Sequence, residues 1–372
     1  MAKVAILGSY ANSLINFRGR LIQDLVGRGH EVFACAPAGS QQLEIDLKKL
    51  GATYCRIPLE RTGMNPLRDT ISLLGLWRFF RKQRPDVVIS YTIKPVIYGS
   101  LAAGLGGVPT VTSIITGLGY MFSGQGKKRA FLEKFGLFLY RIGLRNNQVV
   151  FFQNPDDLKF FQGSGVTNRR SRLVLINGSG IDLDHFSPHP LPKEISFLLI
   201  ARLIREKGIR EYVLAAQALK KSFPAVKFRL VGSIDSTPSA ILPEQLHGWE
   251  RDGTIEYYGQ LDDVRAALRE SAVYVLPSYR EGTPRSVLEA MATGRPIITT
   301  DVPGCRETVE HGRNGFLVPL QNVSQLAAAM EIFVNQPDLA TTMGAESRKI
   351  AENKFDVRLV NQTILKNLEL VA

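Results

Sequence analysis

Short apolar runs alternate with helix-length segments along the whole chain, and this alternation limits the possible folds more than any other feature. In the first half, runs rich in Val, Ile and Phe are bounded by Gly, Pro or Asn, as β-strands are. The predicted strands of this half are 3–8, 31–36, 53–57, 86–90, 110–115, 149–153 and 173–176, and the predicted helices are 18–28, 40–50, 67–83, 96–105, 129–146 and 155–163. This order predicts a mostly parallel, doubly wound α/β sheet.

The second half of the chain repeats the pattern. Its predicted strands are 195–200, 227–231, 255–258, 272–276, 296–300 and 315–318, and its predicted helices are 208–222, 262–270, 285–293, 323–335, 337–352 and 356–371. A length of 372 residues favours two domains. Because three prolines fall in Ser187–Lys193, we place the boundary there and predict one domain over 1–188 and a second over 189–355.

The net charge of +12 is confined to the first half. Residues 1–190 hold 24 Lys and Arg against 12 Asp and Glu, whereas residues 191–372 hold 22 of each. A basic domain beside a neutral one suggests an anionic partner: nucleic acid, an anionic membrane surface or a phosphorylated acceptor. A surface that is basic for solubility alone is the other interpretation.

The cysteine content and the hydropathy of the chain indicate its cellular compartment. The three cysteines, at 35, 55 and 305, form neither a disulfide framework nor a metal-ligand spacing, which suits a reducing cytosol. The first residues predict a β-strand and not a secretory signal. Residues 95–126 carry no charge, but glycines and Pro109 interrupt them, so we expect a helix, a turn and a strand there and not a membrane span.

The block Pro277–Ala290 carries the strongest functional signal. It follows the apolar strand AVYVL, so it leaves the carboxyl end of a strand and leads into a helix. Glu281 and Glu289 lie eight apart, and Gly282 frees the loop to present backbone N–H groups at a helix N-terminus. One carboxylate can accept hydrogen bonds from sugar hydroxyls and the other can bind a ribose diol. The alternative is a capped helix with surface carboxylates.

A second block, Ala201–Gly208, follows the strand ISFLLI. Arg202 and Lys207 leave the same sheet edge five residues apart and could both reach one diphosphate, unless they are solvated surface cations. Such cations would stabilise the charge of a leaving diphosphate without a metal. The turns at Gly232 and Gly259 could frame a flat base, although each is more often only a turn.

The loop 8–19 after the first strand is long and polar. It lacks the GxGxxG spacing of a dinucleotide fingerprint, which disfavours an NAD-dependent dehydrogenase. Its Ser9, Asn16 and Arg18 could contact a phosphate or an acceptor, or the segment could be an ordinary βα loop.

Together these residues resemble the family 4 retaining glycosyltransferases of the GT-B fold. The resemblance rests on REGTPRSVLEAMATGRPIITTDVPGCRETV, on ARLIREKG and on VLINGSGIDLDHF. It implies two Rossmann-like domains facing across a cleft, a nucleotide-sugar donor in the second domain, an acceptor in the first, and a final helix within 356–372 that crosses back to the first domain. It also implies that Arg202 and Lys207 bind the donor diphosphate, that Glu281 meets the sugar hydroxyls, that Glu289 meets the ribose, and that the amides of Gly282 and Thr283 meet phosphate or sugar.

A narrower resemblance comes from GSYANSLINFRG, RTGMNPLRD and ITGLGYMF. These segments are similar to bacterial N-acetylhexosaminyltransferases that extend undecaprenyl-pyrophosphate-linked sugars. That resemblance implies a UDP-sugar donor, a polyprenyl-pyrophosphate glycolipid acceptor and a place in the cytoplasm on the inner face of the cell membrane.

Two positions bear on the chemistry. Many family members carry a His after the strand that ends here at Ile115, whereas this chain has Thr116 and Gly117. If retention proceeds by front-face attack, the departing phosphate can take the acceptor's proton and no protein base is required. Asp182-Leu-Asp184 spells the metal signature of another glycosyltransferase fold, but we interpret it as a turn and expect no metal and no cofactor.

The charge of the first half then suggests a membrane contact. The helices near 67–84 and 127–145 combine apolar and basic residues, a pattern that suits an anionic lipid surface but also a helix whose apolar stripe faces the core. The tip with Tyr120 and Phe122, next to Lys127, Lys128 and Arg129, is the predicted lipid contact. No nucleic-acid-binding signature accompanies the charge, so we expect no nucleic-acid partner.

The sequence therefore predicts a retaining glycosyltransferase that moves an N-acetylhexosamine from a UDP-sugar to a polyprenyl-pyrophosphate-linked saccharide. A transferase with a soluble acceptor and a sugar-nucleotide epimerase or hydrolase of the same fold are the alternatives.

Overall fold

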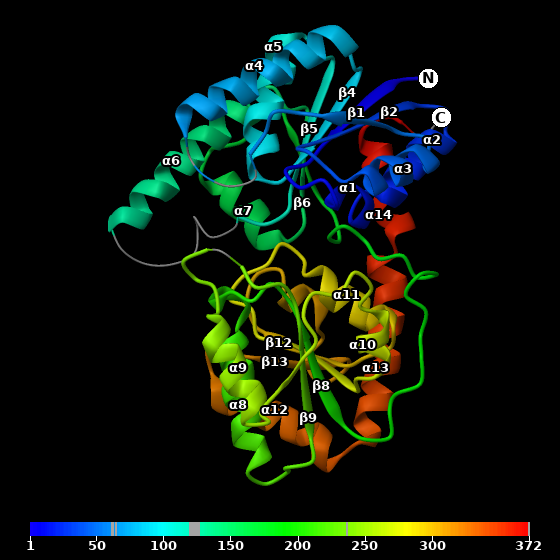
Figure 1. Cartoon of the computed structure of the whole chain (residues 1–372). Helices are drawn as coiled ribbons and strands as arrows, with labels where there is room; N and C mark the ends of the chain where they lie inside the picture. Colours follow the sequence, from blue (N-terminus) through cyan, green and yellow to red (C-terminus); the bar gives the residue numbers. More distant parts are fainter. Residues whose placement is uncertain (61–62, 64, 119–126, 236, 371–372) are drawn as a thin grey trace. The chain divides into compact units, whose positions relative to one another are not determined.

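The computed structural model describes the chain except residues 61–62, 64, 119–126, 236 and 371–372, and it leaves the side chains of 127–131 undescribed. The described residues form two compact units. Unit 1 comprises Met1–Gly180 together with Val357–Ala372, and unit 2 comprises Ile181–Asp356. Each unit is a parallel sheet covered by helices on both faces, which confirms the predicted pair of doubly wound domains (Figure 1).

The unit 1 sheet has the strand order β3-β2-β1-β4-β5-β6-β7, and every pair is parallel. Its strands are β1 (Lys3–Leu7), β2 (Glu31–Ala36), β3 (Thr53–Arg56), β4 (Val87–Tyr91), β5 (Thr110–Ile115), β6 (Val149–Phe152) and β7 (Arg172–Leu175). The strand order reverses between β1 and β4, which pair directly, so the carboxyl ends of these two strands lie side by side at the topological switch point.

The helices of unit 1 cover opposite faces of this sheet because side chains alternate along each strand. Ile6 and Ala34 pack with α2 (Gly19–Gly27), α3 (Gln41–Lys49) and α14 (Val357–Asn367). Leu7 and Cys35 pack with α4 (Pro66–Gln83) and α5 (Ser100–Gly106) on the other face. The remaining helices are α1 (Ser13–Asn16), α6 (Lys127–Leu144) and α7 (Pro155–Gly163). Figure 1 shows α4, α5 and α6 together on one side of the sheet and α2, α3 and α14 on the other.

The last helix belongs to unit 1 although it follows unit 2 in the chain. Val360, Ile364 and Leu365 of α14 are buried in the same apolar cluster as the β1 side chains. Asn361 Nδ2 also donates to Asp24 Oδ2 on α2 at 2.7 Å.

The unit 2 sheet has the order β10-β9-β8-β11-β12-β13, again parallel in every pair. Its elements are β8 (Ser196–Ile200), α8 (Ile209–Lys220), β9 (Lys227–Val231), α9 (Pro243–Arg251), β10 (Glu256–Tyr257), α10 (Arg265–Arg269), β11 (Val273–Leu276), α11 (Arg285–Ala292), β12 (Ile297–Thr300), β13 (Gly315–Val318), α12 (Val323–Asn335) and α13 (Asp338–Ile350). Side chains of α8 and α12 pack on one face, and those of α10 and α11 pack on the other.

The units divide at Gly180, before the proline-rich segment that we expected to separate them. Ile181, Leu183 and Phe186 are already buried in the unit 2 core. The guanidinium of the fully buried Arg295 then donates to the carbonyl oxygens of His189 at 2.9 Å and Pro190 at 3.2 Å. The prolines therefore lie in a strap bound to unit 2 and do not act as a linker.

Local differences from the expected elements are few. The predicted helix 96–105 is a π-helix over Pro95–Gly99 that continues into α5. Helices α1 and α9 were not predicted, because α1 is a single turn and α9 lies among the polar residues of a long β9–β10 connection. No helix within the described part of the chain is long and apolar enough to cross a membrane.

Candidate active site

The carboxyl edge of the unit 2 sheet gathers the predicted donor-site residues. Arg202 follows β8, Gly232 follows β9, Gly259 follows β10 and Glu281 follows β11. Because these four strands are neighbours in a parallel sheet, their following loops emerge at one edge. Ligands of open α/β sheets bind at this edge.

Lys207 and Glu281 meet at this edge. Lys207 ends a 3-10 turn, Arg205–Lys207, that precedes α8, and its ammonium group donates to Glu281 Oε1. Both side chains are largely buried, so the ion pair is partly shielded from water. The two residues predicted to act on one activated sugar are therefore in direct contact.

Two glycines hold the loops that carry this pair close together. Gly208 and Gly304 both have positive φ, at 72° and 84°. A Cβ atom at position 208 would overlap the carbonyl oxygen of Pro277, and one at position 304 would overlap the carbonyl oxygens of Glu281 and Gly282. The Glu281 N–H also donates to the Pro303 oxygen at 3.0 Å. Sequence reasoning missed Gly304, whose signal is a Pro-Gly turn directly after β12.

Glu289 lies on the second turn of α11, as expected. Arg285 Nε donates to Glu289 Oε1 at 3.1 Å. Burial raises the pKa of Glu289, although the Arg285 charge lowers it. Burial also raises the pKa of the nearby Tyr274, and the charges of the Glu289 and Glu281 carboxylates raise it further.

Arg202 contacts a different carboxylate. Its side chain is half-exposed, and Nη1 donates to Asp235 Oδ2 at 3.0 Å. Asp235 lies in the loop after β9 and was not predicted to belong to the site. The two predicted diphosphate cations therefore face the same sheet edge, each with its own acidic partner.

The Gly232 and Gly259 turns are joined to one another. The Gly232 N–H donates to the Gly259 oxygen at 2.8 Å, and the Tyr257 hydroxyl donates to the Gly232 oxygen at 2.8 Å. A side chain at position 232 would overlap the carbonyl oxygen of Ala201, so only glycine fits there. Gly282 and Thr283 lie in the loop just before α11.

The predicted acceptor residues all come after the carboxyl ends of strands of the unit 1 sheet. Ser9 follows β1, and Thr116 and Gly117 follow β5. Asn16, on α1, is exposed. Arg18 is only 2% exposed, and its guanidinium lies over the Tyr91 ring at 4.9 Å. The guanidinium is therefore buried beside the last residue of β4, and its contact with a phosphate or acceptor stays a prediction.

The predicted lipid-contact residues are only partly described. Tyr120 and Phe122 lie outside the described residues. Lys127, Lys128 and Arg129 begin α6, but their side chains are not described. The turn predicted at Asp182–Asp184 is present, since Asp182 Oδ1 accepts from the backbone N–H groups of Asp184 and His185 at 3.1 and 3.2 Å.

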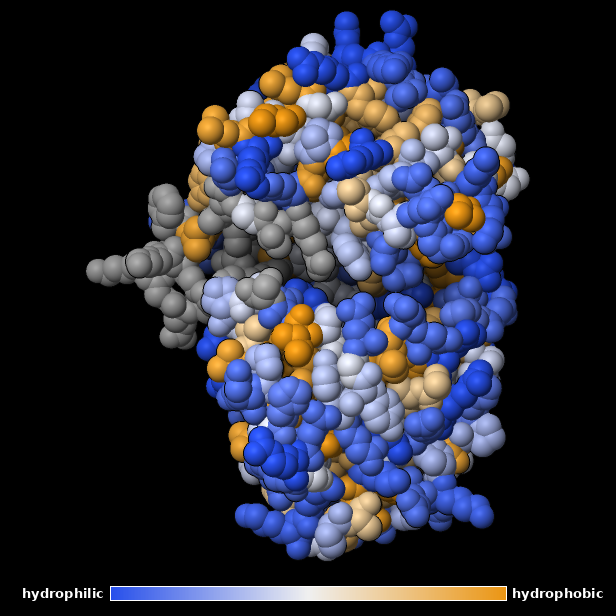
Figure 2. Space-filling view, viewed as in Figure 1, coloured by the Kyte–Doolittle hydropathy of each residue, from blue (hydrophilic) through white to orange (hydrophobic). Residues whose placement is uncertain are grey.

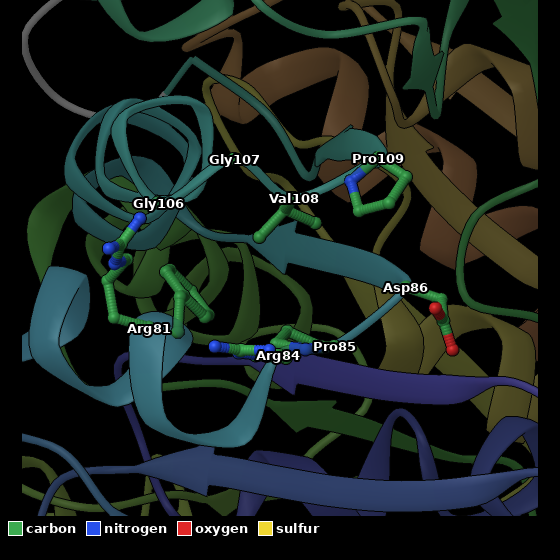
Figure 3. A pocket seen from close by; sticks show the side chains of 9 residues that line it. Arg81, Arg84, Pro85, Asp86, Gly106, Gly107, Val108 and Pro109 are labelled. Carbon is green, nitrogen blue, oxygen red and sulfur yellow. The ribbon is translucent and has the colours of Figure 1, made fainter.

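A cavity of about 370 Å³ in unit 1 lies away from the carboxyl edge. Its lining includes Arg81 and Arg84 at the end of α4 and Val108 and Pro109 just before β5, so it opens at the amino edge of the sheet. Figure 3 shows the Asp86 carboxylate pointing away from both arginines. This position is unsuited to chemistry carried by strand carboxyl ends.

Comparison with known proteins shows which class of enzyme this chain belongs to. Residues 16–177 match the model of the glycosyl transferase 4-like domain, and residues 194–336 match that of the glycosyl transferases group 1. These two models together match most of the chain. The chain is a glycosyltransferase that contains both of these domains.

Two curated relatives of the glycosyltransferase have names that specify sugars linked to diphospho-undecaprenol. The chain is 26% identical to the N,N'-diacetylbacillosaminyl-diphospho-undecaprenol alpha-1,3-N-acetylgalactosaminyltransferase of Campylobacter jejuni, over 98% of this chain and 97% of the relative. It is 23% identical to the UDP-Gal:alpha-D-GlcNAc-diphosphoundecaprenol alpha-1,3-galactosyltransferase of Escherichia coli, over 82% and 81% of the two chains.

Solved structures of low sequence identity share the fold of this glycosyltransferase. Sucrose-phosphate synthase from Thermosynechococcus elongatus superposes with a TM-score of 0.82 at 20% identity, over 99% of this chain and 98% of that one. HepE from Anabaena, in a structure in complex with UDP-glucose, gives 0.78 at 19% identity, over 99% of this chain and all of the other. These likenesses confirm the GT-B fold.

Proposed function

We propose that this glycosyltransferase moves an N-acetylhexosamine, with retention of configuration, from a UDP-sugar to a polyprenyl-diphosphate-linked saccharide of a bacterial surface glycan or glycoprotein. The single observation that carries the proposal is the Lys207–Glu281 contact at the carboxyl edge of the unit 2 sheet. The names of two relatives, which specify diphospho-undecaprenol acceptors, support the choice of acceptor.

In this proposal unit 2 binds the donor. Lys207 and Arg202 bind the diphosphate, Glu281 accepts hydrogen bonds from the sugar hydroxyls, and Glu289 binds the ribose diol. The amides of Gly282 and Thr283 bind phosphate or sugar oxygens, and the joined turns at Gly232 and Gly259 frame the uracil. Lys207 then contacts both the anion that leaves and the carboxylate that orients the sugar.

The chemistry needs cationic stabilisation more than a protein base. As the bond between the sugar C1 and the diphosphate oxygen breaks, negative charge develops on UDP, and preorganised cations lower the energy of that state. The acceptor hydroxyl forms its bond to C1 on the same face, and its proton passes to the departing phosphate oxygen. Thr116, which is neutral near pH 7, then contributes a hydrogen bond to the acceptor, and Gly117, Ser9 and Asn16 line the acceptor edge of unit 1. No metal or cofactor takes part.

An anionic membrane surface is the proposed partner of unit 1, which would place the enzyme on the cytoplasmic face of the cell membrane. On α4, Leu76 and Phe80 are buried as core residues, yet Leu67 and Ile71 are 76% and 60% exposed. Their exposed neighbours Arg78, Arg81 and Lys82 follow on the same helix. Figure 2 shows apolar side chains gathered in the region of α4 and α6. On α6, Phe135, Phe138 and Ile142 are exposed as well.

A transfer assay tests this function. The purified chain is incubated with UDP-N-acetylglucosamine, UDP-N-acetylgalactosamine, UDP-glucose or UDP-galactose and with an undecaprenyl-diphosphate-linked monosaccharide in detergent. We expect a lipid-linked disaccharide whose anomeric configuration equals that of the donor, measured by NMR. Folded protein that releases UDP and free sugar without an acceptor, or that glycosylates only soluble sugars, would contradict the proposal.

A further inference from the structure

The topological switch point of unit 1 carries a polar cluster that no predicted role uses. From this cluster we propose that Lys94, held by Asp69 and Tyr98, is a binding group for the diphosphate of the acceptor lipid. The inference rests on the proposed function and adds to it a cation on the acceptor side of the reaction.

The position of Lys94 follows from the sheet order. It comes three residues after β4, which pairs with β1 where the strand order reverses. Ligands of doubly wound sheets bind outside the carboxyl ends of the strands at such a point. The loops after the two strands are joined, since the Thr92 hydroxyl donates to Ser9 Oγ at 2.9 Å.

The backbone around Lys94 is unusual. Thr92 has φ of 67°, a left-handed conformation that a β-branched residue rarely adopts. Pro95–Gly99 then form a π-helix, a form that often occurs at functional sites. Strained backbone of this kind persists where the surrounding structure enforces it, and it concentrates at binding and catalytic sites.

The ammonium group of Lys94 is held in place by the carboxylate of Asp69. Nζ donates to Asp69 Oδ1 on α4 at 2.7 Å, and the Tyr98 hydroxyl donates to Asp69 Oδ2 at 2.9 Å. Both oxygens of the carboxylate are therefore engaged. Among the described residues, Asp69 is the one hydrogen-bond partner of Lys94, which leaves two N–H donors of the ammonium group for a ligand.

Burial and charge favour an anion as that ligand. The Lys94 and Asp69 side chains are each 12% exposed, so the charge of the ammonium group is weakly screened. Lysine binds phosphate as a point charge. Unit 1 as a whole carries 26 Lys and Arg against 11 Asp and Glu, so its field attracts an anion to this edge. The acceptor's diphosphate is the anion that the proposed reaction brings to unit 1.

The alternative is an ion pair that only fastens α4 to the end of β4. The two interpretations differ in what the loss of Lys94 changes. A structural pair supports stability and affects every ligand alike, whereas a ligand cation affects the diphosphate acceptor selectively.

A binding experiment separates these possibilities and needs no turnover. Farnesyl diphosphate, a polyprenyl diphosphate without sugar, is titrated by calorimetry into the full chain at saturating UDP, which occupies the donor's diphosphate site. Farnesol is the uncharged comparison. The preference is the ratio of the Kd for farnesol to the Kd for farnesyl diphosphate. We expect Lys94→Met to reduce this ratio at least ten-fold. Lys94→Arg should keep part of the wild-type ratio, and Asp69→Asn should reduce it less than Lys94→Met does. Lys48→Met, an exposed lysine on α3, is the matched control and should leave the preference as in the wild type.

Unfolding is controlled in the same samples. UDP-dependent thermal stabilisation of Lys94→Met should equal that of the wild type, because unit 2 is unchanged. Since removal of Lys94 leaves Asp69 without its cation, the paired variant Lys94→Met with Asp69→Asn provides a second, charge-balanced test. If either variant keeps the wild-type preference for farnesyl diphosphate, the inference is wrong.

Kinetics connects the site to the reaction. With a lipid-linked acceptor, Lys94→Met should raise KM for the acceptor at least ten-fold while KM for the UDP-sugar stays near that of the wild type. An equal rise in both KM values would show a structural role and overturn the inference. If the wild type binds farnesyl diphosphate through Lys94 but transfers no sugar to any lipid-linked acceptor, the proposed function fails and the anion site stands.

Discussion

The ammonium group of Lys207 donates a hydrogen bond to the carboxylate of Glu281, from a loop 74 residues away in the chain. The contact joins the end of the turn after β8 to the loop after β11, which are neighbouring strands. Because both side chains are largely buried, each charge lowers the cost of burying the other. The two side chains are thus in place before any donor binds.

Substitution of either partner should reduce turnover far more than stability. We expect Lys207→Met and Glu281→Gln each to lower kcat by about 10²- to 10³-fold, the range found when one preorganised group around a developing charge is removed. The double variant should lose less than the product of the two single losses, because the residues contact each other. Transfer assays at saturating donor measure this, with Lys221→Met and Glu244→Gln on the exposed surface of unit 2 as controls. Wild-type rates in the two single variants would refute the site.

Gly304→Ala should disturb the donor loop, whereas Gly312→Ala should not. Both glycines have left-handed φ, at 84° and 81°, so an alanine at either position costs about 1–2 kcal/mol in backbone strain. Only at 304 would the new methyl group overlap the Glu281 and Gly282 carbonyls, whereas nothing lies within 4 Å at 312. We expect Gly304→Ala to lose UDP binding and kcat as well as stability, measured by thermal shift and transfer assay. Equal effects of the two substitutions on kcat would contradict this.

Glu289 should make stability and nucleotide binding depend on pH in opposite directions. Burial raises its pKa, so the folded state favours the protonated acid. That contribution to stability is present at acid pH and is lost as the pH rises through the raised pKa. Glu289→Gln should therefore melt above the wild type near pH 7, and the gap should close toward pH 4.

The same variant should bind UDP weakly at every pH, since the ribose hydroxyls lose a charged acceptor. In the wild type, UDP stabilisation should fall as acid protonates Glu289. Melting curves with and without UDP between pH 4 and 8 measure both effects, with Glu244→Gln as the control. A Glu289→Gln variant that melts below the wild type at all pH values would oppose this account.

The exposed apolar residues of α4 should control membrane binding. Ile71→Glu with Leu74→Glu adds two negative charges to a face that is already solvated, so folding should be unaffected while binding to anionic vesicles drops at least ten-fold. Arg78→Gln with Arg81→Gln should weaken binding by about 1 kcal/mol per residue, most clearly at low salt. Co-sedimentation with phosphatidylglycerol vesicles measures both. Leu214→Glu with Leu242→Glu, exposed in unit 2, is the control pair, and equal losses in that pair would argue against α4.

Periodicity was sufficient to predict most of the fold, because a strand such as β6 is a continuous apolar run with turn residues on both sides. It also placed Glu281 and Glu289 correctly, since one strand–loop–helix unit carries both. What periodicity could not predict depends on contacts between distant segments. The cation Arg18 belongs to a polar loop, where an exposed side chain is expected, but it is buried and its guanidinium lies over the Tyr91 ring.

The Asp69–Lys94 pair and Gly304 were missed for a related reason. Asp69 appears in the sequence as one more charge at the start of an amphipathic helix, and only the packing of α4 beside the end of β4 joins it to Lys94. The importance of Gly304 depends on a backbone carbonyl that no sequence pattern reports. The proline-rich segment Ser187–Lys193 was expected to mark the domain boundary, whereas the units divide at Gly180. The buried Arg295 guanidinium that binds this segment to unit 2 lies more than 100 residues further on in the chain.

The return of α14 to unit 1 has a consequence for biosynthesis. Every residue of unit 2 is synthesised before Val360, Ile364 and Leu365, yet these three complete the apolar interior around β1. Unit 1 therefore cannot complete its apolar core until the whole of unit 2 has been synthesised. Until α14 packs, the nascent chain exposes the apolar side chains beside α2, and chaperones can bind there.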